Sequence, residues 1–364
     1  MHAQRPVMDD LEGLIASKDI GSRAEALRRV TDLFVSGSAR FSGDQVALFD
    51  EVMRELAREI DVSARAAFGS RLAALPTAPP QVLRDLALDD EILVAEPILS
   101  GAAPLDGATL VEGARTKSQD HLLAISRRPD LSESVTDVLV ERGNREVALS
   151  TASNSGARFS EYGYSTLVDR SGSDGELAVC VWLRAEVPRQ HMLALFAGAS
   201  ASVRARLIAA DRAKADVIRD MVAKAAEQFQ AESRRSAQYA AAESAVQSLY
   251  KFGRLSVTKL VEFASAGKFD ETVVALSILS NLPVGVVERA FTQNASEQIL
   301  VLAKAMGMTW DDTRQLLLLK SGCPSDTADG LDLRGAKFAR LKSETALKTI
   351  QFYRLRERAA TGVA

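Results

Sequence analysis

Apolar residues recur at helical spacing in the first part of the chain. Three runs step by three or four residues, with one adjacent pair in each of the first two: Ala24, Leu27, Val30, Leu33 and Phe34; Val46, Phe49, Val52, Met53 and Leu56; Phe68, Leu72 and Leu75. A stripe at this spacing lies on one face of a helix. We therefore predict three helices in residues 1–75, with Ser22, Ser42 and Ser63 as N-caps, because a serine hydroxyl accepts the first free amide hydrogens.

A longer repeat follows in residues 76–201. Four segments each open with an apolar residue and then run helical: LDGATLVEGAR, LSESVTDVLVERG, FSEYGYSTLVDRSG and VPRQHMLALFAGAS. Val111, Leu139, Leu167 and Leu195 recur every 28 residues in them. A pair of short helices cannot bury its apolar faces alone, so stacked pairs would form a continuous core. The pattern predicts a helical solenoid. The intervening segment ELAVCVWLR favours a helix by its place in the repeat, with a strand as the alternative.

Residues 202–248 contain neither Gly nor Pro and are rich in Ala and charge. They predict one long helix, with a single break near Ala231 as the alternative. Val217, Met221, Ala225 and Phe229 form a narrow stripe along it. A connecting helix that lies on the rest of the chain is favoured over the seam of a homodimer, since no clean heptad repeats three times.

Residues 249–364 predict a compact C-terminal helical domain. Its short helices are separated by turns at AGKF, NLP and MGMT, and a polar loop at 320–335 precedes a basic final helix. Two segments in this domain read helix, turn, helix, as in DNA-binding units. The second helix of the first segment would present Glu288, Arg289, Thr292 and Gln293. That of the second would place Asp311 and Asp312 toward phosphate, which repels them. A structural helix corner is therefore favoured.

The totals agree with a fold made of helices. A chain of 364 residues is too long for one compact core, and its 47% apolar and 26% charged residues are those of an ordinary folded protein. Aromatic residues are only 5%, and good helix formers such as Ala and Leu dominate. We predict an all-α protein: a HEAT-like right-handed solenoid, a long helix and a compact C-terminal helical domain.

Two resemblances point the same way. The residues around RPDLSESV resemble leucine-rich-variant and HEAT-like repeats. The runs LVEFASAGKFDETVVALSILSNLPVGVVERAF, LAKAMGMTWDDTRQLLLL and FARLKSETALKTIQFYRLR resemble the proteobacterial family called Domain of Unknown Function 2336, as do EALRRVTDLF and ARAAFGSRLA near the start. This second resemblance implies a helical bacterial protein and no catalytic residue.

Residues suited to catalysis or metal binding do not form a recognisable set. His2, His121 and His191 lack metal-ligand spacing, and we expect the last two to be satisfied structural histidines. Cys180 lies in an apolar run, and Cys323 lies in a polar loop without a neighbouring His. We predict no catalytic, cofactor-binding or metal-binding residue, and no enzyme. An enzyme whose pocket is assembled from distant residues is the third and weakest hypothesis.

Charge gives one candidate surface. The net charge of −3 argues against a general binder of polyanions. The two cysteines are far apart in the sequence and the first residues do not resemble a signal peptide, so we expect a cytoplasmic protein without a membrane span. Near the end, the segment from Arg334 to Arg358 contains eight basic and two acidic residues. Arg354, Arg356 and Arg358 are the candidate partner-binding residues, with an ordinary solvated helix end as the alternative.

These observations favour a non-enzymatic scaffold or regulatory adaptor that binds another protein. The alternative is a nucleic-acid-binding regulator that uses the helix-turn-helix-like segments and the basic terminal helix.

Overall fold

The computed structural model describes the backbone of residues 20–37, 41–292, 297–321 and 328–361, and the side chains of 23–37, 41–292, 297–320 and 331–355. The described residues are all-α, as predicted, and their one strand-like feature is an isolated bridge between Leu131 and Ala157. The segment ELAVCVWLR, for which a strand was the alternative, forms helix α12 (Gly175–Trp182).

The chain divides into two compact units, residues 1–163 and 164–364. This division differs from the predicted boundaries at 75, 201 and 248. Leu193, in the predicted last repeat, and Tyr239, in the predicted long helix, are buried in one core with the C-terminal helices. Burial of these side chains assigns both segments to the second unit.

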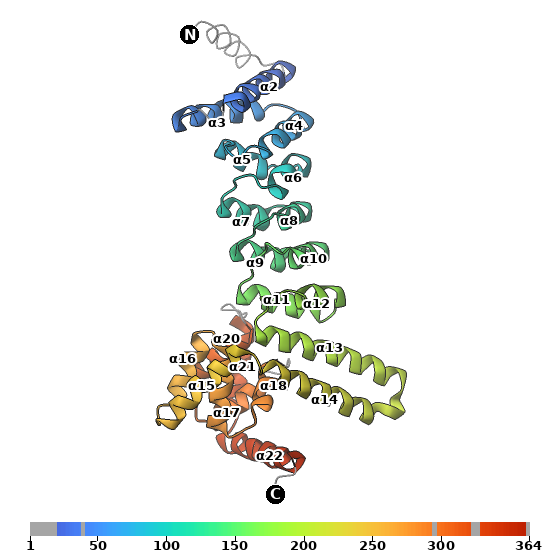
Figure 1. Cartoon of the computed structure of the whole chain (residues 1–364), viewed down its shortest axis with the longest axis vertical. Helices are drawn as coiled ribbons and strands as arrows, with labels where there is room; N and C mark the ends of the chain where they lie inside the picture. Colours follow the sequence, from blue (N-terminus) through green and yellow to red (C-terminus); the bar gives the residue numbers. More distant parts are fainter. Residues whose placement is uncertain (1–19, 38–40, 293–296, 322–327, 362–364) are drawn as a thin grey trace. The chain divides into compact units, whose positions relative to one another are not determined.

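The first unit is a series of short helices: α2 (Ile20–Gly37), α3 (Gly43–Ala57), α4 (Val62–Ala73), α5 (Pro80–Ala87), α6 (Ile92–Ser100), α7 (Gly107–Thr116), α8 (Gln119–Ser126), α9 (Glu133–Arg142) and α10 (Arg145–Ser153). Each helix from α2 to α8 packs against the next but one along the chain. The odd-numbered helices therefore form one row and the even-numbered helices a second (Figure 1).

Three of the four predicted core positions of the repeat are buried. Leu139 and Leu167 are fully buried and Leu195 is 6% exposed, whereas Val111 is only partly buried because its neighbour Leu110 takes the inward position. In the first stripe, Leu33 is 38% exposed, so its predicted core role is wrong.

The N-cap predictions have mixed outcomes. Ser42 caps α3 and exchanges hydrogen bonds with Gln45 in a capping box. Ser63 is not the cap of α4: the carboxylate of Asp61 accepts the amide hydrogen of Ala64. Ser22 falls inside α2. At α4, Asp61 thus takes the place of the predicted cap Ser63, since Asp and Ser side chains accept the first amide hydrogens of a helix equally well.

The helices of the second unit are α11 (Glu161–Ser171), which begins just before the boundary, α12, α13 (Arg189–Ala210), η2 (Arg212–Lys214), α14 (Ala215–Ser233), α15 (Ala237–Lys251), α16 (Val257–Ser265), α17 (Phe269–Ser280), α18 (Val284–Thr292), α19 (Glu297–Ala305), α20 (Trp310–Ser321), α21 (Ala328–Arg340) and α22 (Ser343–Thr361). Most of the buried residues of its core come from α15 to α22, and Val273, Ala275 and Leu276 of α17 are all fully buried.

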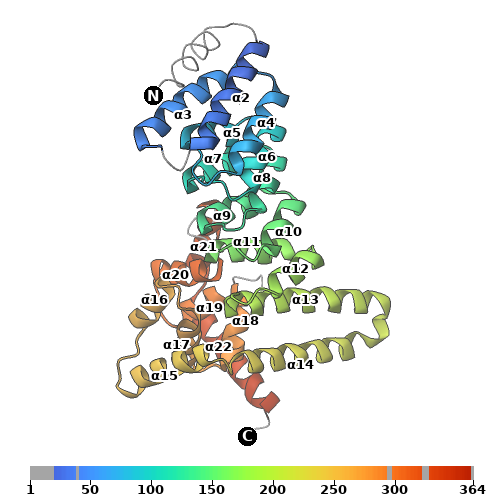
Figure 2. The ribbon, with the colours of Figure 1, turned by 45° about the horizontal axis from the view of Figure 1, so that its top comes forward.

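The predicted single helix over 202–248 is wrong, because the chain turns there twice. The break between Ser233 and Ala237 lies close to the alternative break near Ala231, whereas the turn at Asp211 was not predicted. Asp211 is extended, and its carboxylate accepts the amide hydrogen of Ala213 at 3.1 Å. Ser236 caps α15 by accepting the amide hydrogen of Tyr239. Polar side chains that cap a helix start also compete with an unbroken helix. As a result, α13 and α14 lie side by side as an antiparallel hairpin (Figure 2).

The predicted polar loop at 320–335 is too long. Helix α20 continues to Ser321 and α21 begins at Ala328, while residues 322–327 lie outside the described residues. Leu331 and Phe338 of α21 are buried in the core, and this apolar spacing stabilises a helix within a segment of polar composition.

Candidate functional site

The basic final helix α22 is anchored by one face. Ala346 is fully buried and Ile350 is 4% exposed, and both lie on the side of α22 that faces the core. Helix α22 packs mainly against α19. A single apolar stripe of this kind fixes which residues of α22 remain on the surface.

Arg354 of α22 reaches the end of helix α17. Its Nε donates to the carbonyl oxygen of Ser280 at 3.1 Å, and a second guanidinium nitrogen donates to the same oxygen. The next residue, Asn281, has the left-handed conformation that ends α17, with a φ of 51°. A cation is favourable at the carbonyl end of a helix. The structure therefore places Arg354 in an intramolecular contact at the end of α17. The side chains of Arg356 and Arg358 lie outside the described residues.

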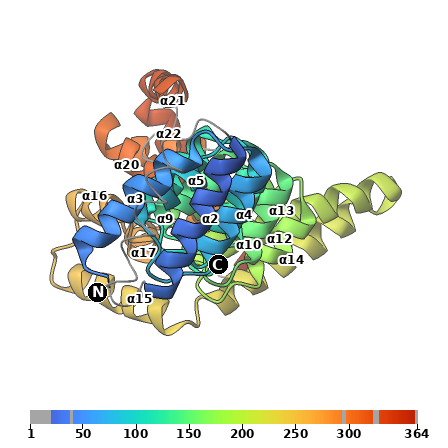
Figure 3. The ribbon, with the colours of Figure 1, turned by 90° about the horizontal axis from the view of Figure 1, so that it is seen from above.

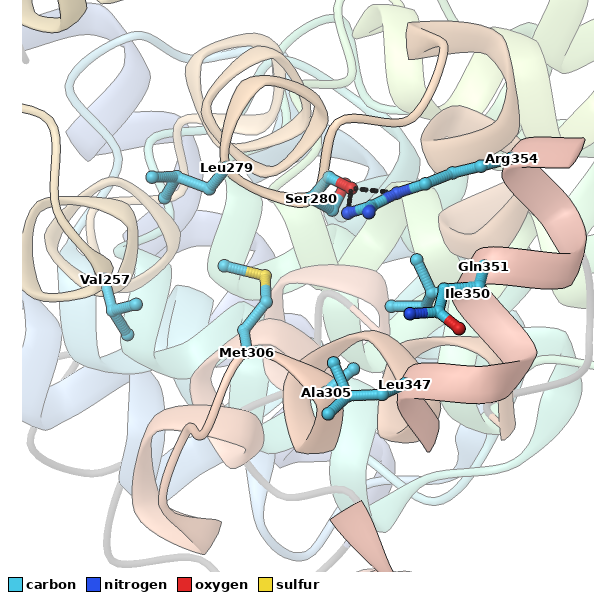
Figure 4. Close-up of a pocket in the computed structure, with 9 residues that line it drawn as sticks. All are labelled: Val257, Leu279, Ser280, Ala305, Met306, Leu347, Ile350, Gln351 and Arg354. Carbon is cyan, nitrogen blue, oxygen red and sulfur yellow. Dashed lines mark hydrogen bonds between the residues drawn. The ribbon is translucent and has the colours of Figure 1, made fainter. Parts of the chain in front are cut away.

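A cleft of about 230 Å³ lies beside this contact. It is lined from α16, α17, α19 and α22 by Val257, Leu279, Ser280, Ala305, Met306, Leu347, Ile350, Gln351 and Arg354 (Figure 4). The lining residues include no carboxylate, imidazole or thiol. The cleft can therefore accept an apolar side chain, and its own residues supply no acid, base or nucleophile.

Large apolar side chains on α22 continue from the cleft to the surface. Leu347 is 47% exposed, Phe352 64% and Leu355 65%. Leu347, Gln351 and Leu355 are spaced by four residues and so follow one another along one side of the helix. We call Leu347, Gln351, Phe352 and Leu355 the α22 face. An exposed apolar stripe beside a cleft is typical of an interaction site.

Four charged side chains meet elsewhere in the second unit: Arg189 of α13, Arg234 after α14, Asp270 of α17 and Glu288 of α18. The side chain of Arg234 is 26% exposed, and the other three are 9% exposed or less. Arg189 donates to Asp270 at 2.6 Å and also to Glu288, and Arg234 donates to Glu288 at 2.7 Å. We call these four residues the ion cluster.

Burial shapes the electrostatics of the ion cluster. The carboxylate of Glu288 is fully buried, and that of Asp270 is 6% exposed. Burial raises the pKa of Asp270, and the guanidinium of Arg189 opposes this rise. Two cations balance two anions, so the ion cluster is suited to fixing α13, α17 and α18 relative to one another. Sequence reasoning missed it because its members are up to 99 residues apart.

A comparison with protein families places this chain. Residues 94–351 match the family described as "Uncharacterised protein conserved in bacteria (DUF2336)". The chain belongs to this family. The matched range contains the whole ion cluster and most of the cleft, whereas the similar motifs near the start, EALRRVTDLF and ARAAFGSRLA, fall outside it. No curated protein and no solved structure matches the chain.

In this DUF2336 protein, the first helix-turn-helix-like segment does not present the expected residues. Glu288 of its second helix belongs to the ion cluster, and the hydroxyl of Thr292 donates to the carbonyl oxygen of Glu288. Gln293 lies outside the described residues. Glu288 and Thr292 of α18 thus make contacts within the protein.

The second such segment also has structural contacts. Asp312 accepts the backbone amide hydrogen and the hydroxyl hydrogen of Thr309, and Thr309 in turn accepts the amide hydrogen of Asp312. This is the pairing of a capping box, and Thr313 of the same helix is fully buried. These contacts agree with a helix corner.

The two described histidines both have contacts within the protein. The imidazole of His121 has Ser118 Oγ at 2.7 Å and the carbonyl oxygen of Asp89 at 3.0 Å. His191 is 5% exposed and stacks on the ring of Tyr164. Cys180 is partly buried in α12. His2 and Cys323 lie outside the described residues.

Proposed function

We propose that this protein is a non-catalytic adaptor, a scaffold or regulator that binds another protein through the α22 face. The observation that carries the proposal is the exposure of three large apolar side chains beside a cleft, because an exposed apolar surface is more stable when a partner covers it. The stacked helix pairs of the first unit offer a further extended surface for contacts.

The chemistry of the partner follows from the residues around the α22 face. An apolar anchor side chain would enter the cleft between Leu347 and Met306. Arg340 and Lys342, just before α22, are exposed and have no ion-pair partner among the described residues. Acidic residues next to the anchor would complement them. We therefore infer an amphipathic partner segment with one large apolar anchor and flanking carboxylates.

The proposal of a non-enzyme rests on the same cleft. Its polar groups are Gln351, Ser280 and Arg354, and the last two are already bonded to each other. The ion cluster has more chemistry, but its carboxylates are buried and paired with guanidinium groups. A general acid or base needs a proton that substrate can reach.

The test is the double variant Leu347→Ser, Leu355→Ser in the native bacterium, compared by quantitative affinity purification with the wild type. A matched control is Tyr250→Ser, Phe252→Ser, which removes two other exposed apolar side chains of the second unit. We expect a protein that co-purifies with the wild type and the control to be depleted at least tenfold by the α22-face variant. Equal recovery with all three chains would refute the role of this face.

Binding of nucleic acid is the alternative function, supported by the exposed cations Arg340 and Lys342 and by the basic α22. It predicts retention of RNA or DNA that weakens steeply with salt. A mobility-shift assay at low salt with Arg340→Glu, Lys342→Glu separates the two proposals: only nucleic-acid binding predicts a shift that this variant abolishes.

A further inference from the structure

The hairpin formed by α13 and α14 carries large apolar side chains that the protein leaves uncovered. Val203 is 52% exposed and Leu207 47% on α13, and Val217 is 60% and Met221 66% exposed on α14. The two helices run together beyond the other helices of the second unit (Figures 1, 2 and 3). These four side chains are separate from the α22 face and from the ion cluster.

The four apolar side chains lie on the same side of the hairpin. Ile208 of α13 and Ile218 and Val222 of α14 are partly buried and so face the space between the helices. Leu207, Val217 and Met221 each come directly before one of these inward positions, and Val203 lies one turn before Leu207. Successive residues of a right-handed helix are about 100° apart around its axis. The two helices of an antiparallel pair run in opposite directions and face each other, so the residues just before their inward positions lie on the same side of the pair.

Charges are distributed unequally between the two sides. Asp216 and Glu227 directly follow inward residues, so by the same geometry they lie on the opposite side. Arg206 and Lys224 point outward, away from the partner helix, at the edges of the apolar side. Both are exposed, and neither has an ion-pair partner among the described residues. One side of the hairpin is therefore apolar. Its outward edges carry the cations Arg206 and Lys224, with one acid, Asp220, one turn before Lys224.

Composition adds an independent observation. By length and apolar composition, one helix among the described residues qualifies as a candidate membrane span: α13, whose best window has a mean hydropathy of 1.4 and is 11% buried. Its partner α14 carries Asp216, Arg219, Asp220, Lys224 and Glu227. Charged groups are costly in the hydrocarbon core. The pair is thus suited to lie on a membrane surface, with α13 and one flank of α14 in contact with lipid.

We propose that this side of the hairpin docks on an anionic lipid bilayer. Val203, Leu207, Val217 and Met221 enter the boundary between headgroups and acyl chains, and Arg206 and Lys224 pair with lipid phosphates. An apolar strip bordered by Lys and Arg is what surface binding to anionic lipid requires. A second copy of the chain fits less well, since a twofold contact would bring the same cationic edges together.

The test is co-sedimentation of the full chain with vesicles of phosphatidylcholine alone or with 30% phosphatidylglycerol. We expect binding to the anionic vesicles that weakens as salt rises, and little binding to the neutral ones. Leu207→Ser, Met221→Ser should lower the partition coefficient at least tenfold, and Arg206→Gln, Lys224→Gln should remove the preference for anionic lipid. The matched control Asp216→Asn, Glu227→Gln, on the opposite side, should not weaken binding.

Three results would overturn the proposal. The first is no binding to anionic vesicles at low salt, and the second is binding that Leu207→Ser, Met221→Ser leaves unchanged. The third is a dimer in light scattering that this variant dissociates while no lipid binds, which would assign the surface to a second copy. All six positions are exposed, and circular dichroism of each variant shows whether the fold is kept.

Discussion

The ion cluster allows a quantitative prediction about stability. Glu288→Gln keeps the size of the side chain and removes its charge, so the fully buried site is left with Arg189, Arg234 and one remaining carboxylate, that of Asp270. The carboxylate accepts from both guanidinium groups, and each charge-assisted hydrogen bond contributes roughly 1.5–3 kcal/mol against about 1 kcal/mol for a neutral one. Two weakened bonds and one uncompensated charge imply a loss of about 3–5 kcal/mol in the free energy of unfolding.

The chain provides a selective assay for this loss. Its two tryptophans, Trp182 and Trp310, both belong to the second unit, so their fluorescence during urea unfolding reports on that unit. The matched control is Glu227→Gln, an exposed glutamate of α14, which should change stability by less than about 0.5 kcal/mol. If Glu288→Gln shifted the midpoint no more than Glu227→Gln does, the ion cluster would not hold the unit together as argued.

Three further changes test other parts of the account. Leu139→Asp places a carboxylate at a fully buried position and should lower the free energy of unfolding by more than about 4 kcal/mol, which unfolds helix pairs of the first unit. Leu93→Asp, at a position that is 65% exposed, should leave these helices folded. Far-UV circular dichroism on heating distinguishes the two variants. Arg128→Ala removes donors to three backbone carbonyls and should cost about 2–4 kcal/mol in urea unfolding, against under 0.5 for the exposed Arg127→Ala. Burial lowers the pKa of Lys320 from 10.5 to about 8. Between these pH values the unfolded chain binds a proton at Lys320 that the folded chain does not, so the stability that neutral Lys320 allows is present above pH 10.5 and is lost as pH falls through 8. Unfolding stability of the wild type should rise from pH 8 to 10, and Lys320→Met should flatten this rise and be more stable near pH 7; a rise unchanged in the variant would contradict the assignment.

Helical periodicity was sufficient for much of the fold. The 28-residue recurrence located Leu139 and Leu167 in the core, because apolar spacing and burial are tied by the geometry of a helix. It could not show that the chain turns at Asp211, since a segment without Gly or Pro gives no break signal. There, an aspartate cap and the burial of Tyr239 in the core decide the path. Tertiary contacts thus override local propensity.

The candidate site was less accessible to sequence reasoning. Basic composition drew attention to α22, and the helix does carry an exposed face, but which arginine stays on the surface depends on packing. Arg354 is drawn to the carbonyl end of α17, a position 74 residues away in sequence. Glu288 gave the opposite error: as a polar residue of a helix-turn-helix-like segment it suggested a surface position, and its two arginine partners place it in the core.

The central claim is that a protein partner covers the α22 face, and site-specific photocrosslinking in living cells tests it most directly. A photoreactive amino acid is placed at Leu347, Phe352 or Leu355, and at Tyr250 as the control. We predict one and the same crosslinked protein from all three α22 positions. This adduct should be absent at Tyr250, and a peptide with an apolar anchor and acidic flanks should compete with it. No protein adduct from the three positions, or the same adducts at Tyr250, would contradict it.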